Sequence, residues 1–297
     1  MTSWRDSLAE RFYRLAAGGW VSRKHFLPEV PDWSSLPART GPLRLEIVSH
    51  CWKYSHLLAY QLSSLVLYPP TKLSVRMTVF HSPEDQKTVE LLKFFESQSP
   101  PNVTWNWWPI EKTSLFRRAI GRNLAALATE ADWIWFTDCD QVFHRGCLDA
   151  LAEQLEGRND PLVFPRHEQC TPLLENADAL LQAAMHKPAI VEIDPERFVT
   201  VTSDRAIGPL QITHGDAARK LGYCNCIPLY QKPVDRWQKT FEDRGFRWLI
   251  GSQGVPVQVP GLFRIEHVQK GRYDSHAESA RLRRWLRSLR PRSAEKS

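Results

Sequence analysis

The segment that decides the fold reads Trp133-Ile134-Trp135-Phe136-Thr137-Asp138-Cys139-Asp140-Gln141. The stretch from Trp133 to Thr137 is an apolar run of strand length, and two acids one residue apart, Asp138 and Asp140, follow it directly. A short apolar run of this kind is typical of a strand that is buried on both faces of a parallel sheet. We therefore expect both acids at the carboxyl end of a buried strand, where the ligands of such sheets bind.

Upstream of this segment, short apolar runs alternate with stretches of helical period. The expected strands are Leu45–Ser49, Leu73–Phe80 and Val103–Trp108, and the expected helices are Tyr54–Leu67, Glu84–Glu96 and Leu115–Glu130. Strands separated by helices of this length imply right-handed βαβ units and a mostly parallel central sheet flanked by helices. The predicted fold class is therefore α/β.

After Gly157 the pattern is less regular and predicts a mixed half that completes a cleft against the first. The expected strands are Leu162–Phe164, Phe198–Thr202, Ile207–Ile212, Val255–Val259 and Leu262–Val268, and the expected helices are Asn176–His186 and Pro233–Arg244.

Composition and length indicate a globular protein. The 297 residues, 42% of them hydrophobic, are enough for one large domain. No apolar run approaches the roughly 18 to 20 residues that span a bilayer, and the first thirty residues lack an apolar signal core. We expect a cytoplasmic protein, with peripheral contact to a membrane left open. Six cysteines then fit reduced thiols, and their spacing does not fit a structural zinc site.

The excess positive charge lies in the C-terminal tail. The formal net charge is +6, and the segment from Lys270 to Ser297 holds nine basic residues against three acids, which is the same +6. This distribution argues against a nucleic-acid partner, which usually meets a basic stripe on the folded body. Apolar residues recur at helical spacing between Leu282 and Leu289 among arginines. The tail is expected either to bind an anionic membrane surface or to pack on the domain.

Asp138 and Asp140 indicate a divalent metal site. Two ionised acids held this close repel each other, so a fold tolerates them mainly where a cation offsets their charge. Oxygen ligands suit Mg²⁺ or Mn²⁺, which take their remaining ligands from water and substrate phosphates. A solvated acidic turn is the alternative interpretation.

The order of motifs then resembles a known family. The run Gly121-Arg122-Asn123, an Ala/Leu-rich helix, the acid Asp132, the apolar strand and Asp-x-Asp are similar to the core of GT-A glycosyltransferases, especially family 2. The resemblance covers about residues 43–268 and is strongest between Arg118 and Asp140. It implies a GT-A-like nucleotide-binding fold and a metal-dependent transfer, with inversion, of a sugar from a nucleoside diphosphate donor to an acceptor hydroxyl.

The resemblance also implies an organisation of the chain. The expected parts are an N-terminal helix and linker (1–42), a nucleotide-sugar-binding half (43–157), an acceptor-binding and catalytic half of the same domain (158–270) and the basic amphipathic tail (271–297). The acceptor is not identified, and a lipid-linked glycan or glycolipid would suit a tail that binds a membrane.

Carried over residue by residue, the resemblance assigns the donor and metal sites. Asp138 is expected beside the ribose and the metal, and Asp140 and His267 at the metal. The other residues expected to bind the donor are Ser49, His50, Asp85, Arg118, Arg122, Lys270 and Arg272. For Asp85 an equal alternative is that it caps the helix that follows it.

The segment Phe241-Glu242-Asp243-Arg244 resembles the Glu-Asp motif of the same family, whose acid removes the proton of the acceptor. Asp243 is expected to be this base, with Glu242 in reserve. The alternative is a charged helix whose two acids pair with neighbouring arginines.

Three other functions remain open at this stage. A sugar-phosphate nucleotidyltransferase needs the same metal and phosphate groups. A phosphatase of the haloacid dehalogenase type also follows a strand with Asp-x-Asp, but on the first strand of its core. A non-catalytic module that binds nucleotide sugars at a membrane is the third.

Overall fold

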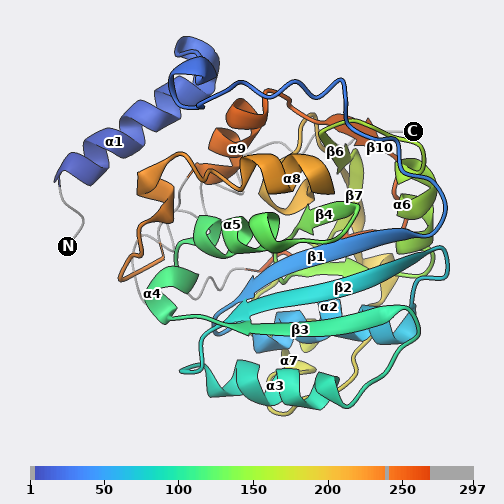
Figure 1. The fold of residues 1–297 in the computed structure, drawn as a ribbon. Helices are drawn as coiled ribbons and strands as arrows, with labels where there is room; N and C mark the ends of the chain where they lie inside the picture. Colours follow the sequence, from blue (N-terminus) through green and yellow to red (C-terminus); the bar gives the residue numbers. More distant parts are fainter. Residues whose placement is uncertain (1–3, 238–240, 268–297) are drawn as a thin grey trace.

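The computed structural model describes residues 4–237 and 241–267 (Figure 1). Its helices are α1 Trp4–Leu15, α2 Ser55–Leu67, α3 Gln86–Glu96, α4 Lys112–Leu115, α5 Arg118–Ala128, α6 Cys147–Leu155, α7 Ala179–Gln182, α8 Gly215–Leu221 and α9 Glu242–Ile250, with the short turns η1 Ala16–Trp20, η2 Arg23–His25, η3 Pro195–Arg197, η4 Gly208–Leu210 and η5 Pro228–Gln231. Its strands are β1 Leu43–Cys51, β2 Leu73–His81, β3 Val103–Pro109, β4 Trp133–Phe136, β5 Gln141–Phe143, β6 Leu162–Pro165, β7 His167–Cys170, β8 Val199–Thr202, β9 Gln211–His214, β10 Val255–Val257 and β11 Leu262–Arg264.

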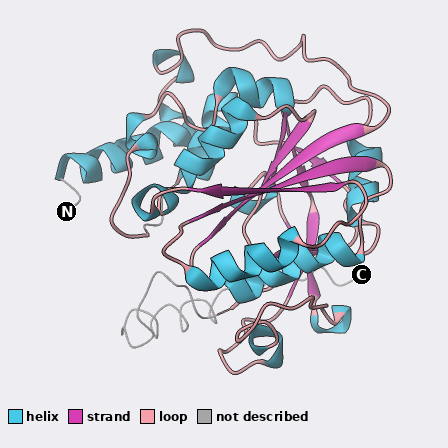
Figure 2. Cartoon of the chain, turned by 60° about the horizontal axis from the view of Figure 1, so that its bottom comes forward, coloured by secondary structure: helices cyan, strands magenta, loops and turns pink. Residues whose placement is uncertain are grey.

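A seven-stranded sheet forms the centre, in the order β10-β6-β9-β4-β1-β2-β3. Strand β9 runs antiparallel to its neighbours β4 and β6, and the other pairings are parallel. Figure 1 shows α5, α8 and α9 on one side of the strands and α2 and α3 on the other, and Figure 2 shows the twisted sheet between these two helical layers. The predicted α/β fold with a mostly parallel sheet is confirmed.

Strand β4 lies at the centre of the hydrophobic core. Trp133, Ile134, Trp135 and Phe136 have no exposed surface. The strand pairs with β1 on one side and β9 on the other, so its backbone groups are satisfied while both faces are covered by apolar side chains. This arrangement explains why the sequence is apolar at every position here rather than at alternate ones.

A second sheet extends the molecule beyond the Asp-x-Asp segment. Its order is β5-β11-β7-β8, with β11 antiparallel to β5 and parallel to β7. The main sheet itself continues across the expected division at Gly157, because β6, β9 and β10 pair into it. The two expected halves therefore share one sheet.

Several elements differ from the sequence prediction, among them the expected helix Leu115–Glu130, which is divided into α4 and α5, and the expected strand from Leu262, which ends at Arg264. The expected strand Ile207–Ile212 begins as the turn η4, because Pro209 fixes the backbone of the turn, and the strand starts only at Gln211. The expected helix Asn176–His186 is shortened to α7, whose N-cap Asp178 accepts a hydrogen bond from Leu180 N. The expected helix Pro233–Arg244 is wrong over its described start, where Val234 N donates to Thr113 O.

Several predictions concern residues outside the described ranges. Lys270, Arg272 and the whole tail 271–297 lie there, so their expected roles stay predictions. Within the described ranges, the helices are all too short or too polar to cross a bilayer. The six cysteines lie in the described ranges and are unpaired.

Candidate active site at the carboxyl edge of the sheet

The carboxyl ends of β1 and β4 are joined by a buried polar network. Ser49 Oγ lies 2.7 Å from Thr137 Oγ1 and donates to Gln61 Oε1 at 2.6 Å. Gln61 Nε2 in turn donates to the backbone oxygen of Asp138 at 3.1 Å. Ser49, predicted to border the donor, is thus a buried residue whose hydrogen bonds fix the backbone at the first acid of the motif.

Arg118 brings the two acidic motifs together. Its Nη1 lies 2.5 Å from Asp138 Oδ1, and its Nε lies 3.9 Å from Glu242 Oε1. Burial lowers the pKa of this guanidinium, but the charges of Asp138 and Glu242 raise it by more, so the pKa stands above its ordinary value. Motifs more than a hundred residues apart in the sequence therefore meet at the first residue of α5.

Arg122 is buried and also lies close to the carboxylate of Asp138. It has no exposed surface, and it donates to the Tyr223 hydroxyl at 2.9 Å and to the backbone oxygen of Thr137 at 3.3 Å. Its Nη2 lies 3.5 Å from Asp138 Oδ1. The next residue, Asn123, accepts a hydrogen bond from Tyr223 N at 2.8 Å. The motif thus connects α5 to the segment after α8.

His50 packs tightly beneath the start of α5. Its ring stacks on Phe80, with 5.0 Å between the ring centroids. A Cβ atom at Gly121 would lie 2.3 Å from His50 Nε2, so the glycine makes room for the ring. Burial, and then the nearby charges of Arg122 and Arg118, hold the pKa of His50 well below its ordinary value. His50 is therefore neutral at physiological pH.

Asp85 occupies the N-cap position of α3, but its side chain makes no capping hydrogen bond to the backbone of the helix. Its carboxylate accepts hydrogen bonds from Lys53 N at 2.5 Å and from Thr88 Oγ1 at 2.7 Å. It thereby anchors the loop after β1, where Lys53 has a positive φ of 60°. The expected contact of Asp85 with the donor stays a prediction.

Glu242 and Asp243 begin α9 but differ in exposure. The side chain of Glu242 is only 3% exposed and faces Arg118. The side chain of Asp243 is 30% exposed, and its Oδ2 lies 3.2 Å from Arg247 Nη1. Each acid thus has an arginine neighbour, as the alternative interpretation of a charged helix also expects. Asp243 is the more accessible of the two to an acceptor.

The segment that carries His267 runs beside Asp140. Ile265 N donates to the backbone oxygen of Asp140 at 2.9 Å, and the backbone of His267 forms an isolated parallel β-bridge with that of Leu174. Across residues 4–237 and 241–267, no three His, Cys, Asp or Glu side chains form a group that could hold a metal ion. The oxygen donors of the Asp-x-Asp motif nonetheless suit Mg²⁺ or Mn²⁺, which need only one or two carboxylates when substrate phosphates supply further ligands.

The sequence did not predict a second cluster of charged and polar side chains, which lies near Asp140. Arg264 Nη2 on β11 lies 3.0 Å from Glu168 Oε1 on β7, and Gln141 Nε2 on β5 donates to Glu168 Oε2 at 3.2 Å. Burial raises the pKa of Glu168, and the charge of Arg264 opposes this. The nearby charge of Asp140 helps to raise the pKa of Arg264. Strands of three or four residues leave no periodic signal from which these contacts could be found.

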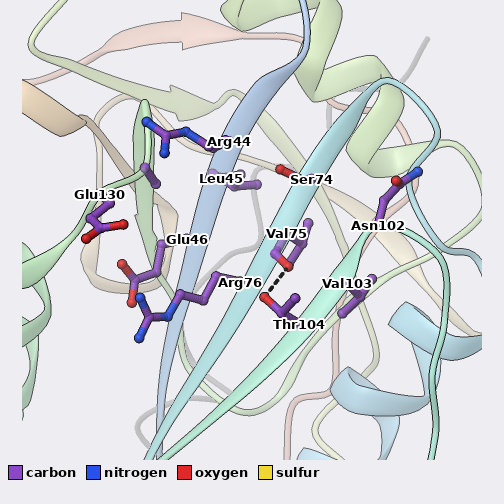
Figure 3. A pocket seen from close by; sticks show the side chains of 11 residues that line it. Arg44, Leu45, Glu46, Ser74, Val75, Arg76, Asn102, Val103, Thr104 and Glu130 are labelled. Atoms are coloured by element: carbon purple, nitrogen blue, oxygen red, sulfur yellow. Dashed lines mark hydrogen bonds between the residues drawn. The ribbon is translucent and has the colours of Figure 1, made fainter.

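A cavity of about 290 Å³ lies away from this site, at the opposite edge of the sheet, at the amino ends of β1, β2 and β3. Figure 3 shows its lining, in which Glu46 and Arg76 lie beside each other on neighbouring strands. Ligands of parallel sheets bind at the carboxyl edge, so we assign no part of the reaction to this cavity.

The sheet order and the helices on both faces define an α/β fold with a mostly parallel central sheet. No family model matches the chain, and no curated protein is significantly similar to it in sequence.

Among the solved structures that are similar to this chain are three with TM-scores below 0.5. S. aureus TarS 1–349 in complex with UDP-GlcNAc is 12% identical, with a TM-score of 0.47 over 79% of this chain and 61% of that one. TarS 1–349 without a named ligand is also 12% identical, with a TM-score of 0.41 over 76% and 58%. The mannosyltransferase PcManGT from Pyrobaculum calidifontis, in complex with GDP-Man and Mn²⁺, is 15% identical, with a TM-score of 0.46 over 97% and 77%. The chain spans about three fifths of the length of the TarS 1–349 structures.

Proposed function

We propose that this protein is a metal-dependent glycosyltransferase that moves a sugar from a nucleoside diphosphate donor to an acceptor hydroxyl with inversion. The observation that carries the proposal is the position of Arg118, which lies within ion-pair distance of both Asp138 and Glu242. A diphosphate could bind to the guanidinium of Arg118, because it lies between the two acidic motifs at the carboxyl edge of a mostly parallel sheet.

Within this proposal the two arginines have different tasks. The Arg118 side chain is 21% exposed, so its guanidinium can exchange part of its contact with Asp138 for a phosphate oxygen of the donor. Arg122 is fully buried and bonded to Tyr223, so it positions Asp138 rather than touching the donor. Lys270 and Arg272 remain candidates for the departing diphosphate.

Asp140 would hold the metal together with the diphosphate oxygens of the donor, with His267 as a further candidate ligand. When bound, the metal would neutralise the negative charge that develops on the leaving diphosphate. Asp138 would face the ribose side, where Arg118 and the Gln61 network hold it in place.

Asp243 is the proposed base, because it is the more exposed acid of the Glu-Asp motif. Asp243→Asn keeps the shape but cannot accept a proton, so transfer should fall about 10²-fold or more while donor binding survives. Glu242→Gln is the matched variant on the same turn. If Glu242→Gln abolishes transfer at unchanged donor affinity while Asp243→Asn retains it, the two roles are reversed.

The experiment that tests the proposal is a screen of nucleotide sugars by thermal shift with and without Mn²⁺, because a bound donor raises the melting temperature. The stabilising donor is then assayed for release of nucleoside diphosphate. Asp140→Ala should abolish the Mn²⁺-dependent part of this turnover. Full metal-stimulated turnover by Asp140→Ala would refute the metal assignment. Formation of a nucleotide sugar from a sugar phosphate and a nucleoside triphosphate, with release of pyrophosphate, would indicate a nucleotidyltransferase instead.

A further inference from the structure

Helix α1 presents a row of large apolar side chains to the outside. Leu8, Phe12 and Leu15 are 53%, 46% and 62% exposed, and Trp4 and Trp20 at the two ends are 69% and 85% exposed. The spacings of four, four and three residues from Trp4 to Leu15 put these side chains on one side of the helix. We call Trp4, Leu8, Phe12, Leu15 and Trp20 the α1 outer face.

The opposite side of α1 holds the helix on the body. Lys232 Nζ lies 2.9 Å from Asp6 Oδ2, and the ring centroid of Tyr13 lies 6.1 Å from that of Tyr230. Figure 1 shows α1 projecting at the edge of the molecule, away from the sheet. These contacts fix the helix so that its outer face is directed away from the protein, and so much exposed apolar surface in one place is typical of an interaction site.

The charge around this face is positive. The acid Asp6 is paired with Lys232, and the guanidinium of Arg23 turns to the body, where it donates to Leu249 O at 2.9 Å. Arg11 and Lys24 are exposed. The surroundings of the outer face therefore favour a partner that is negatively charged.

A basic cavity lies immediately next to the outer face. Its volume is about 500 Å³, and Ala17 and Gly18, between Leu15 and Trp20, form part of its wall. The rest of the lining consists of Asp204, Arg205, Arg244, Arg247 and Gln253. Arg205 is paired with Asp204 and Arg247 with Asp243, so the positive charge of the cavity comes from Arg244, which also donates to Ala17 O. Guanidinium groups bind phosphate oxygens well.

We propose that α1 is an interfacial helix that lies on an anionic lipid membrane, with its outer face among the acyl chains and the arginine-lined cavity over the lipid phosphates. Tryptophan at both ends of an apolar face, with basic residues beside it, is the pattern that suits the boundary between headgroups and acyl chains. Basic residues near the surface add to the attraction when the lipids are anionic. The inference does not depend on the proposed sugar transfer.

The test is co-sedimentation of the full chain with vesicles of phosphatidylcholine alone or with phosphatidylglycerol added, at low and high salt. The C-terminal tail is present in every variant, so differences between variants do not come from the tail. Leu8→Ser/Phe12→Ser should weaken binding to the anionic vesicles at least tenfold. The matched control is Leu124→Ser/Leu127→Ser, which removes two exposed leucines from α5 and should bind as the wild type does.

A third variant separates charge from apolar contact. Arg205→Gln/Arg244→Gln should lose most of the salt-sensitive part of the binding while keeping the salt-resistant part. Leu8 and Phe12 are about half exposed, and Phe12 also contacts Phe26, so the fold of every variant is checked by its circular dichroism and only variants that remain folded are compared. Equal binding by Leu8→Ser/Phe12→Ser and the wild type overturns the proposal. So does a wild-type dimer in sedimentation velocity that the α1 variant abolishes, because a second copy would then cover the face.

Discussion

Replacing Arg118 by methionine should cost more stability than removing a similar arginine elsewhere. Methionine keeps much of the length of the side chain and removes its charge, which leaves Asp138 and Glu242 without their shared cation. Two unit charges 4 Å apart interact by about 4 kcal/mol at the effective dielectric of a protein surface. Desolvation of the ions and the partial exposure of Arg118 and Asp138, at 21% and 32%, offset much of this energy. We expect the free energy of unfolding to fall by about 1–3 kcal/mol, measured by urea denaturation at neutral pH.

The matched control is Arg197→Met. Arg197 lies 2.6 Å from Asp178, but its side chain is 36% exposed and the pair involves one acid only. In this control variant the free energy of unfolding should therefore fall by less than about 1 kcal/mol. A double variant with Glu242→Gln adds a second check, because removing the acid should recover part of the loss caused by Arg118→Met. Equal losses for Arg118→Met and Arg197→Met, with no coupling to Glu242, would refute the assignment of Arg118 as the cation shared by both motifs.

Three further outcomes follow from buried groups near the site. Burial lowers the pKa of His56 from 6.5 to about 4, so the folded state resists protonation. The contribution of His56 to stability should be full above pH 6.5 and fall by about 2 kcal/mol on going to pH 5. In urea titrations at the two pH values, His56→Gln should remove this share of the loss and leave the share of the other buried histidines, such as His50. Gly121→Ala places a Cβ atom 2.3 Å from His50 Nε2 and should lower the free energy of unfolding by about 1–3 kcal/mol, although alanine favours helix; an unchanged urea midpoint would contradict the tight packing. Gln61→Met removes the bonds to Ser49 and to the Asp138 backbone and should cost about 1–3 kcal/mol together with weaker donor binding by calorimetry, whereas unchanged values for both would mean that the network is dispensable.

The sequence was sufficient to predict the central sheet and the location of the acids. Strand β4 is apolar at every position because both of its faces are buried, and that pattern is visible without any knowledge of its partners. The position of Asp138 and Asp140 at the end of this strand followed directly from it. The longer helices were found for a related reason, since α2 and α3 each span at least three turns.

Side-chain roles that depend on distant residues could not be predicted. Arg122 is expected from the sequence to bind the donor, and that role stays a prediction, but its hydrogen bond to Tyr223, 101 positions away, could not be found from the sequence. The ion pair of Glu168 with Arg264 joins two short strands that are far apart in the chain. Local patterns carry no information on such pairings, because they are set by the packing of the whole fold.

The antiparallel strand β9 has a consequence for how the protein is made. Strand β4 finds β1 early, but its other edge is closed only by β9, which leaves the ribosome about 80 residues later, or roughly 4–16 s at ordinary translation rates. During that interval the nascent chain carries an open strand edge built from Trp133, Ile134, Trp135 and Phe136, and an open edge of this kind pairs readily with other chains. Synthesis at low temperature or with a chaperone in excess should therefore raise the yield of folded protein more than changes to the finished surface do.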